Sequence, residues 1–225
     1  MALERDKVVA ASLILLDEVG LDGLTMRALA KRLAVQAPTL YWHFPSKQAL
    51  LDQMADAIIA PVPAAIPPGE PPDTVLRSLA DAMRRALLSR RDGARVYAGT
   101  YVMGENVLAV ADIALGALMQ KGLDERGAAD EMFNIVYYIL GHAIEEQGFQ
   151  ERWVSADDGT VAGMRRLLAE PASRRFPSLS RCVDTILASD FDARFRRGVD
   201  SWLHGLERKE AAPRVRSARS ASVKS

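Results

Sequence analysis

The sequence predicts an all-α protein with a small N-terminal helical head and a larger helical body. Three observations predict this fold class. Apolar residues recur at spacings of three and four over most of the 225 residues, as on the buried face of a helix. No stretch shows the convincing alternation of apolar and polar residues that marks a strand. Six prolines within residues 61–72 interrupt the helical pattern.

The head begins with a helix expected over residues 6–19, which Gly20 is expected to end as a C-terminal cap. The dense apolar face of this helix includes Val9, Leu13 and Leu16. A linking helix with Leu50, Leu51, Met54 and Ile58 at core spacing is expected to follow the head. The chain is assigned to five segments: the head (1–46), the linking helix (47–60), a stiff, exposed proline-rich connector (61–72), the body (73–209) and a tail (210–225).

Within the head, two short helical patterns flank a three-residue break at residues 34–36. Thr25 can cap the first helix, because its hydroxyl can accept a hydrogen bond from a free backbone N–H of the first turn. Pro38 suits the first turn of the second helix, expected over residues 37–44. In the first pattern the inward-facing residues are Met26, Leu29, Ala30 and Leu33, and the outward-facing ones are Arg27 and Lys31.

The second helix of this pair combines a small apolar anchor with a polar and aromatic outward face. At about 100° per residue, Leu40 and Phe44 point together toward the protein. The residues left outward are Pro38, Thr39, Tyr41, Trp42 and His43. Exposed rings cost free energy unless a partner covers them, and residues 25–47 contain four basic residues and no acidic one. The pattern is typical of a helix-turn-helix that binds the major groove of DNA. The alternative is a helical pair whose two large rings are half-buried against a neighbour.

The body is expected to be helical throughout, with breaks at glycine and proline. Its expected helices span residues 73–89, 94–101, 105–121, 124–147, 160–168 and 191–208. Asp73 is expected to cap the first of them, and Gly122 to end the third. The tail is basic, rich in serine and alanine and without periodicity, so it is expected to be disordered.

Two of these helices carry more apolar surface than one body needs, which favours a homodimer. The helix over 124–147 is apolar on nearly every side, and the last helix repeats Phe191, Phe195, Val199, Trp202 and Leu206 at helical spacing. Together they can form a four-helix contact across a two-fold axis. Such a dimer would place two heads one turn of DNA apart, about 34–36 Å. The alternative is that both apolar stripes pack within their own domain.

Composition excludes several classes of protein. No run of about 18 apolar residues predicts a membrane span, and the charged N-terminus is not that of a signal peptide. Cys182 is the single cysteine, which fits a cytoplasmic protein without an internal disulfide, and its helical pattern predicts a buried side chain. The net charge is zero, so any attraction to DNA has to be local.

The sequence contains no catalytic or metal-binding motif, so no enzymatic activity, cofactor or metal site is expected. A helical small-molecule carrier that does not bind DNA is the rival class.

Residues 8–53 resemble the DNA-binding domain of the TetR family of bacterial transcriptional regulators. The resemblance rests on the run Pro38-Thr39-Leu40-Tyr41-Trp42-His43, followed by Lys47 and by Ala49-Leu50-Leu51-Asp52. It implies operator DNA as a partner, contacted by Thr25, Met26 and Arg27, by the recognition element Gln36, Ala37, Pro38, Thr39, Tyr41, Trp42 and His43, and by Lys47 at a phosphate. Two positions depart from the family pattern. Ala34 replaces a common turn glycine at a left-handed position, at a cost of about 1 kcal/mol. Ala37 replaces a polar residue with which the tetracycline repressors read a base.

Polar and aromatic residues of the body cluster around Tyr97–Tyr101 and around Tyr137–Glu146, as expected for a ligand pocket. Tyr138, His142 and Glu145 fall on one face of their helix. The alternative is that these tyrosines fill the core with satisfied hydroxyl groups.

The resemblance extends to residues 85–100 and 141–147, which are similar to the tetracycline-responsive branch of the family. It implies that Tyr97 occupies the position of a histidine that holds the magnesium–tetracycline chelate in that branch. It also implies that the water shell of the metal would lie near Thr100 and Glu145, and that further drug contacts would fall at Pro63, Leu79 and Met83. A neutral phenol is a poor magnesium ligand, so a more apolar, aromatic inducer such as an antibiotic or a polyketide-like metabolite is expected. The expected ligand-binding residues are Leu79, Met83, Tyr97, Thr100, Tyr101, Tyr138, His142 and Glu145. A repressor is the expected function, with an activator of the same fold as the alternative.

Overall fold

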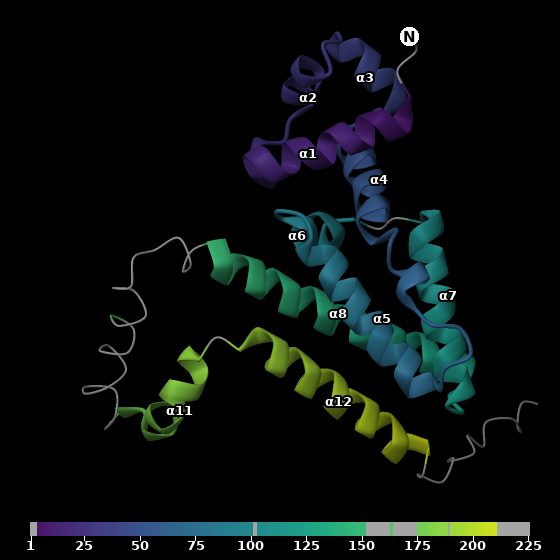
Figure 1. The fold of residues 1–225 in the computed structure, drawn as a ribbon, viewed down its shortest axis with the longest axis vertical. Coiled ribbons are helices and arrows are strands. Elements are labelled where there is room, and N and C mark those ends of the chain that lie inside the picture. Colours follow the sequence, from purple (N-terminus) through teal and green to yellow (C-terminus); the bar gives the residue numbers. More distant parts are fainter. Residues whose placement is uncertain (1–3, 101–102, 152–162, 164–174, 189, 211–225) are drawn as a thin grey trace, which may run out of the picture.

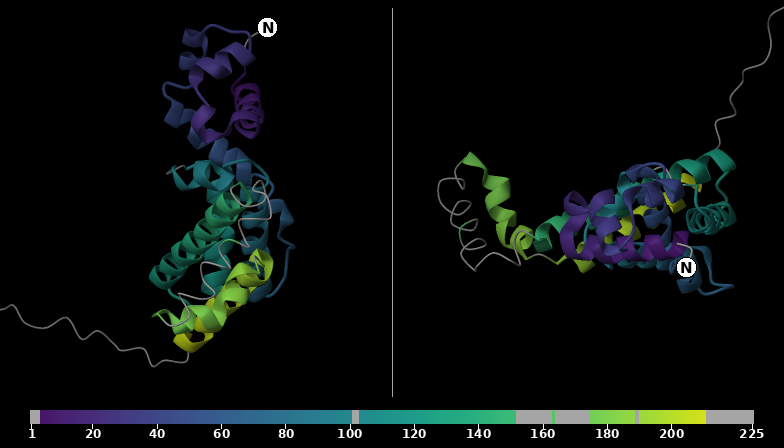
Figure 2. Two further views of the ribbon diagram at one scale, coloured as in Figure 1. Left: turned by 90° about the vertical axis from the view of Figure 1, so that its left-hand side faces the viewer. Right: turned by 90° about the horizontal axis from the view of Figure 1, so that it is seen from above.

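The computed structural model describes residues 4–100, 103–151, 163, 175–188 and 190–210. Over these ranges the chain is helical and contains no strand, so the predicted all-α fold is confirmed (Figure 1). The head stands at one end of an elongated molecule and is joined to the body through α4, as the side view in Figure 2 also shows. No helix in the described ranges is both long enough and apolar enough to cross a membrane.

The head consists of α1 (Arg5–Gly23), α2 (Met26–Arg32) and α3 (Ala37–His43). Leu13 and Leu16 on α1, Leu29 on α2 and Leu40 on α3 are buried in one core. The predicted break at Gly20 is present. Its backbone is non-helical, with φ 71° and ψ 175°, a conformation that costs glycine little. A further short helical stretch continues α1 beyond this kink to Gly23.

The turn between α2 and α3 has the predicted backbone. Thr25 is the N-cap of α2, and its side chain accepts a hydrogen bond from the backbone N–H of Ala28 at 3.1 Å. Ala34 lies in the left-handed region with φ 53°. Pro38 lies in the first turn of α3, where its missing N–H breaks no helical bond.

The proline-rich segment after α4 (Lys47–Ile59) is less exposed than predicted. Its short 3-10 helix η1 (Pro63–Ala65) packs against the body helices that follow, and Val62 just before it is buried. Ile66 also packs partly against the core. The other residues of the segment are mostly exposed, as predicted, so the difference is confined to these apolar side chains.

The body is built on α5 (Pro72–Leu88), α6 (Gly93–Ala98), α7 (Glu105–Gln120) and α8 (Glu125–Phe149). α5 packs against both α7 and α8. The predicted cap at Asp73 is wrong, because the helix already begins at Pro72 and its N-cap is Pro71. The carboxylate of Asp73 instead accepts a hydrogen bond from Lys121 Nζ at 2.6 Å.

The chain ends with α11 (Pro177–Leu187) and α12 (Phe191–Glu210). α12 lies along α8 and α5, with Phe195, Val199, Leu203 and Leu206 buried. Cys182 on α11 is exposed in the single chain, so the prediction of a buried thiol is wrong. The helix expected over 160–168 lies outside the described residues except at Gly163, and the expected tail lies outside them beyond Glu210.

Candidate DNA-reading face and ligand cleft

The outer face of α3 carries large side chains on a narrow apolar anchor. Leu40 and Phe44 are fully buried, whereas Trp42 is 82% exposed and Tyr41 is 49% exposed. The ring of His43 meets the ring of Trp42 edge-on, with their centroids 5.0 Å apart. The two rings that the sequence predicts to face outward therefore do so.

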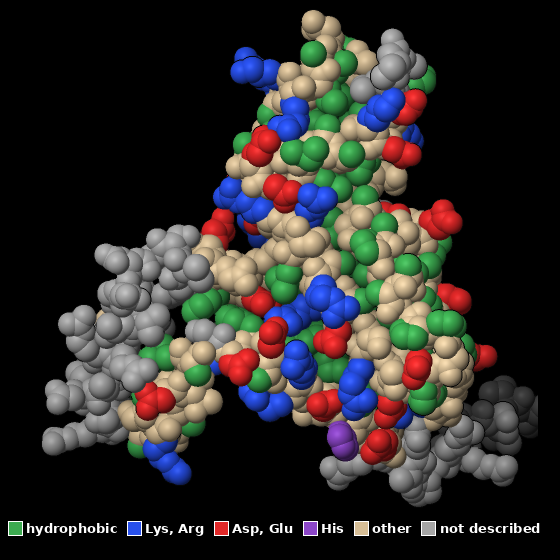
Figure 3. Space-filling view, in the orientation of Figure 1, with side chains coloured by type: hydrophobic (Ala, Val, Ile, Leu, Met, Phe, Trp, Pro, Cys, Tyr) green, Lys and Arg blue, Asp and Glu red, His purple; other side chains and the backbone are tan. Residues whose placement is uncertain are grey.

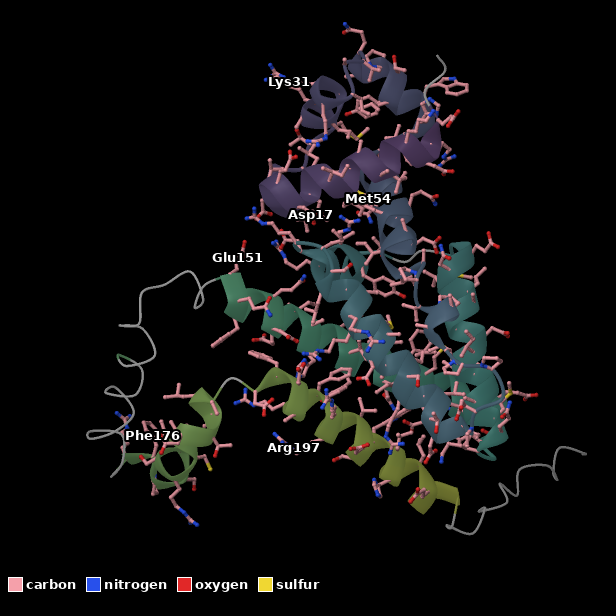
Figure 4. All side chains as sticks on the ribbon, in the orientation of Figure 1. Asp17, Lys31, Met54, Glu151, Phe176 and Arg197 are labelled. Atoms are coloured by element: carbon pink, nitrogen blue, oxygen red, sulfur yellow. The ribbon has the colours of Figure 1, made fainter. Side chains whose placement is uncertain are left out.

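The residues beside α3 divide into surface and core. Exposed side chains are those of Thr25, Arg27, Gln36, Pro38 and Thr39. Met26 is buried among the core residues and Ala37 packs partly against them, so neither side chain is free to read a base. Lys31 points outward from α2 (Figure 4). Lys47 Nζ donates to the carbonyl oxygen of Leu21 at 3.3 Å, which holds this ammonium at the edge of the head.

The electrostatics of the head suit contact with phosphate. Figure 3 shows a few separate basic side chains on the head among apolar and other atoms, and acidic and basic side chains mixed where the head meets the body. Arg32 on the same helix as Lys31 is paired with Glu18 at 2.6 Å, so it stays in the protein's own network. Hydroxyl and cationic groups contact DNA backbone, while side chains in the groove read base edges and methyl groups.

Hydrogen bonds and ion pairs that sequence reasoning missed join the head to the body, and we call this network the polar lock. Asp92, 8% exposed and left-handed with φ 56°, accepts a hydrogen bond from the Leu21 N–H at 2.8 Å. Arg95 also donates to Asp92 at 2.8 Å. Asp17, which faces the body in Figure 4, accepts from Arg90 at 2.7 Å and from the Arg91 N–H at 3.0 Å. The lock ties the end of α1 to the corner between α5 and α6.

The charge of Asp92 makes the lock sensitive to acid. Burial raises the pKa of Asp92, but the Leu21 N–H and the Arg95 guanidinium outweigh it and lower the pKa below 3.8. A lowered pKa in the folded state stabilises the fold at pH values above the pKa of the unfolded state, and this stability is lost as pH falls through the folded-state pKa.

We expect Asp92→Ala to cost about 1–3 kcal/mol of unfolding free energy at pH 7. Asp92→Asn should cost less, because asparagine tolerates the left-handed conformation. Urea unfolding as a function of pH should show the wild-type advantage over Asp92→Asn shrinking below about pH 4. An advantage that is independent of pH would contradict this assignment.

Gln147 connects the far end of α8 to the same corner. Its Nε2 donates to the carbonyl oxygens of Leu87 at 3.3 Å and Arg90 at 2.7 Å, and its Oε1 accepts from the Ala94 N–H at 3.2 Å. One side chain therefore satisfies three backbone groups at the α5–α6 corner. Gln147 thus links α8 directly to the corner that holds the head.

An open cleft of about 1600 Å³ lies between α8, the α5–α6 corner and the α11–α12 hairpin. Tyr138, His142 and Glu145 line it, as the sequence predicts for one helix face. Tyr97 and Thr100 lie outside its lining, Leu79 and Met83 are buried in the core beside it, and Tyr101 is outside the described residues. The predicted ligand residues thus fall into a group that lines the cleft and a group that does not.

His142 lies in an aromatic cage at the wall of this cleft. Its ring packs against Tyr138, Phe191 and Phe195, with centroids 5.1–6.0 Å apart. Burial, and then the charge of Arg84, lowers the pKa of His142, which favours the neutral imidazole. The hydroxyl of Tyr138 donates to the carbonyl oxygens of Arg194 and Phe195, both at 3.1 Å, so it is already satisfied within the chain.

Beneath His142 lies a buried ion pair that joins three helices. Arg84 on α5 donates to both carboxylate oxygens of Glu146 on α8 at 2.7–2.9 Å, and it also pairs with Asp192 on α12 at 2.8 Å. Arg84 is 9% exposed and Glu146 is 6% exposed. Sequence reasoning noted Glu146 only as a neighbour of Glu145 and missed this pair. The only signals of this ion pair in the sequence are Arg84 on an apolar helix face and Glu146 four residues after His142.

Comparison with known proteins identifies the chain. Residues 8–54 match the bacterial regulatory proteins of the tetR family, and residues 68–209 match the tetracyclin repressor-like C-terminal domain. The chain belongs to the TetR family. The tetracycline repressor protein class A from transposon 1721 of Escherichia coli is 37% identical over 214 residues, which are 94% of each chain.

Solved structures of TetR proteins share the whole fold. One similar structure is a possible TetR family transcriptional regulator from Streptomyces coelicolor A3(2), with a TM-score of 0.81, 35% identity and coverage of 92% of this chain and 100% of that one. Another is a TetR variant from Acinetobacter baumannii AYE in complex with minocycline, with a TM-score of 0.71, 33% identity and coverage of 93% and 99%. The head and body of this chain are therefore the two parts of a TetR regulator.

Proposed function

We propose that this TetR protein is a ligand-responsive repressor that binds operator DNA as a homodimer and releases it when a small molecule binds the body. The observation that carries the DNA-binding part is the exposed Tyr41–Trp42 pair on a fully buried Leu40–Phe44 anchor. A chain that only carries a small molecule would have no use for such an arrangement. The relatives named as repressors support the same reading.

Operator recognition is assigned to the outer face of α3 and the start of α2. The side chains proposed to reach bases are Gln36, Pro38, Thr39, Tyr41, Trp42 and His43. The proposed backbone contacts are Thr25 and Arg27, with Lys47 turning from the Leu21 carbonyl to a phosphate. Met26 and Ala37 are left out of the base readers, since both pack against the core.

The dimer contact is assigned to α8 and α12. Phe133 is 50% exposed and Tyr137 is 65% exposed on the single chain, and their rings stack with centroids 5.9 Å apart. One helical turn separates them, so they form an apolar patch on α8 that the described part of the chain leaves at least half exposed. The same patch on a second copy gives the self-complementary contact that a two-fold axis requires.

The inducer is proposed to be an aromatic molecule that binds without magnesium. Burial, followed by the charge of Asp56, raises the pKa of Tyr97, which keeps its phenol neutral. Leu79 and Met83 have apolar side chains that cannot ligate a metal, and they are 2% and 0% exposed within the core. A magnesium chelate needs several hard oxygen ligands, whereas these three positions suit an apolar ring system. Over the described residues no group of three His, Cys, Asp or Glu side chains could hold a metal ion.

Ligand titration tests this assignment. Tryptophan fluorescence of the purified protein is expected to change on addition of polycyclic aromatic antibiotics at micromolar concentrations, and to change far less with tetracycline plus magnesium. Replacing Tyr97 by histidine should increase the response to tetracycline plus magnesium, because imidazole is a better metal ligand than a neutral phenol. Tight binding of tetracycline with magnesium to the wild type, together with no response to the other compounds, would rule out the proposed inducer class.

The mechanism follows from a two-state equilibrium of the dimer. The inducer shifts the protein toward the body shape for which its affinity is higher, and only by that difference in affinity. The repressing shape holds two heads at the operator spacing, and the induced shape does not. Since α4 is the helix between head and body (Figure 1), its orientation sets the position of the head.

A further inference from the structure

One face of α4 holds the two ends of the segment that links α6 to α7. Gln48 Nε2 donates to the Gly99 carbonyl oxygen at 3.2 Å. Two turns further along, Asp56 accepts hydrogen bonds from the Val107 N–H at 3.0 Å and from Asn106 Nδ2 at 2.8 Å. We call these contacts of Gln48 and Asp56 the α4 clamp. It joins the linking helix to the end of α6 and to the start of α7.

Asp56 supplies the N-terminal cap that α7 lacks. The N-cap residue of α7 is Gly104, which has no side chain to accept from the free N–H groups of the first turn. The Val107 N–H is the donor that an N-cap side chain ordinarily satisfies, and a carboxylate near this end of a helix is favoured by the helix dipole. The first turn of α7 thus depends on a side chain of the linking helix.

Gly104 is explained by the close approach of Asp56. Its φ of −76° and ψ of 162° suit any residue, so backbone conformation does not require glycine here. A Cβ atom added at this position would lie 2.1 Å from Asp56 Oδ1 and 2.8 Å from Asp56 Cβ. The absence of a side chain at residue 104 therefore lets the α4 carboxylate reach α7.

One end of the clamp lies beside residues that the sequence predicts to contact the inducer. Tyr97 and Thr100 lie at the end of α6, where the hydroxyl of Thr100 donates to the Tyr97 carbonyl oxygen at 2.8 Å. Gly99, between them, is the acceptor for Gln48. Movement of the end of α6 on ligand binding would act on the Gln48 end of the clamp, and so on α4.

We propose that Asp56 is a positioning residue, which fixes the orientation of α4, and hence the spacing of the two heads, through its bonds to the start of α7. This inference rests on the proposed function, because head spacing matters only to a dimer that reads two half-sites. It names the contact through which the ligand-binding body controls that spacing.

The test compares operators of different half-site spacing. The full-length wild type is used to select its operator from random duplex DNA, and a second duplex carries two extra base pairs between the half-sites. Asp56→Ala is expected to reduce the preference for the native spacing by about tenfold, the effect of losing one helix cap. Binding to non-specific DNA at low salt should be unchanged, because the heads remain intact. Asp112→Ala, which removes an exposed carboxylate from α7, is the charge-matched control and should keep the wild-type preference.

A second set of variants separates positioning from loss of folding. Gly104→Ala should reproduce the Asp56→Ala effect, because the added methyl displaces the carboxylate. The double variant should be no worse than either single one, since each breaks the same contact. Asp56→Asn keeps an acceptor for the Val107 N–H and should recover most of the preference. Additive effects, or a wild-type preference in Asp56→Ala, would overturn the proposal.

Amide hydrogen exchange tests the clamp without DNA. Asp56→Ala should speed exchange at the first turn of α7 while leaving α2 and α3 unchanged. If the wild type selects no operator, the proposed function fails, whereas this exchange pattern still reports whether the clamp exists. If the operator is selected and exchange at Val107 is unaffected by Asp56→Ala, the clamp is wrong and the function stands.

Discussion

Replacing Tyr41 by alanine is expected to lower operator affinity by about tenfold to a hundredfold, the equivalent of one good contact in the groove. Trp42→Ala should have an effect of similar size, because Trp42 is the most exposed ring on α3. Both side chains project away from the core, so the unfolding free energy should change by less than about 0.5 kcal/mol. Mobility-shift titrations with the selected operator, beside thermal unfolding of each variant, measure the two quantities.

Two controls make this result specific to recognition. Tyr41→Phe keeps the ring and removes the hydroxyl, so it separates apolar contact with the groove from a hydrogen bond. Ile14→Ala removes an exposed apolar side chain from α1 and should leave DNA affinity unchanged. If the Tyr41→Ala variant shifts the mobility of the operator at the same protein concentration as the wild type, α3 does not read the DNA.

Arg84→Ala is expected to destabilise the body by about 3–5 kcal/mol, because it leaves Glu146 buried without its partner. The double variant Arg84→Met with Glu146→Leu should lose much less, since no charge is then left uncompensated in the core. Asp192, the other partner of Arg84, has a side chain that is 66% exposed, so water can solvate it when the arginine is removed. Urea unfolding of the single and double variants measures these differences.

The same variants locate the instability. Arg84, Glu146 and Asp192 belong to α5, α8 and α12, all in the body, so hydrogen exchange should rise there and stay unchanged in α2 and α3. Equal losses in the single and double variants would contradict the account of a compensated ion pair. They would mean that stacking of the Arg84 guanidinium over Phe195, with Cζ 5.0 Å from the ring centroid, is the dominant contribution.

The parts of the fold that sequence predicted correctly depend on neighbours along the chain. The cap at Thr25, the left-handed Ala34 and the burial of Leu40 under an exposed Trp42 all follow from spacing within one or two helical turns. Local rules suffice there, because the side chains concerned contact residues three or four positions away.

The contacts that sequence reasoning missed join residues far apart in the chain. Asp92 caps nothing nearby but holds Leu21, 71 residues away, and Arg84 meets Glu146, 62 residues away. Such pairs exist only after the helices pack, so no local period reveals them. The error at Asp73 has the same cause. Its carboxylate meets Lys121 at the end of α7, and a proline provides the start of the helix in its place.

The predicted ligand residues show where family resemblance and geometry diverge. Tyr138, His142 and Glu145 line the open cleft, while Tyr97 and Thr100 lie at the end of α6, on either side of Gly99 in the sequence. Periodicity correctly placed the first group on one helix face. The resemblance suggested the second group, and local spacing could not show that Leu79 and Met83 are buried or that Tyr97 and Thr100 lie outside the lining of the cleft.

Footprinting of the full-length protein on its selected operator shows whether two heads bind DNA together and release it together. We expect protection of two symmetric half-sites whose centres are about 34–36 Å apart, one turn of DNA. We also expect an aromatic inducer identified by fluorescence to abolish protection of both half-sites together. Protection of a single half-site, or protection that persists when the inducer saturates the protein, would contradict a ligand-responsive dimer.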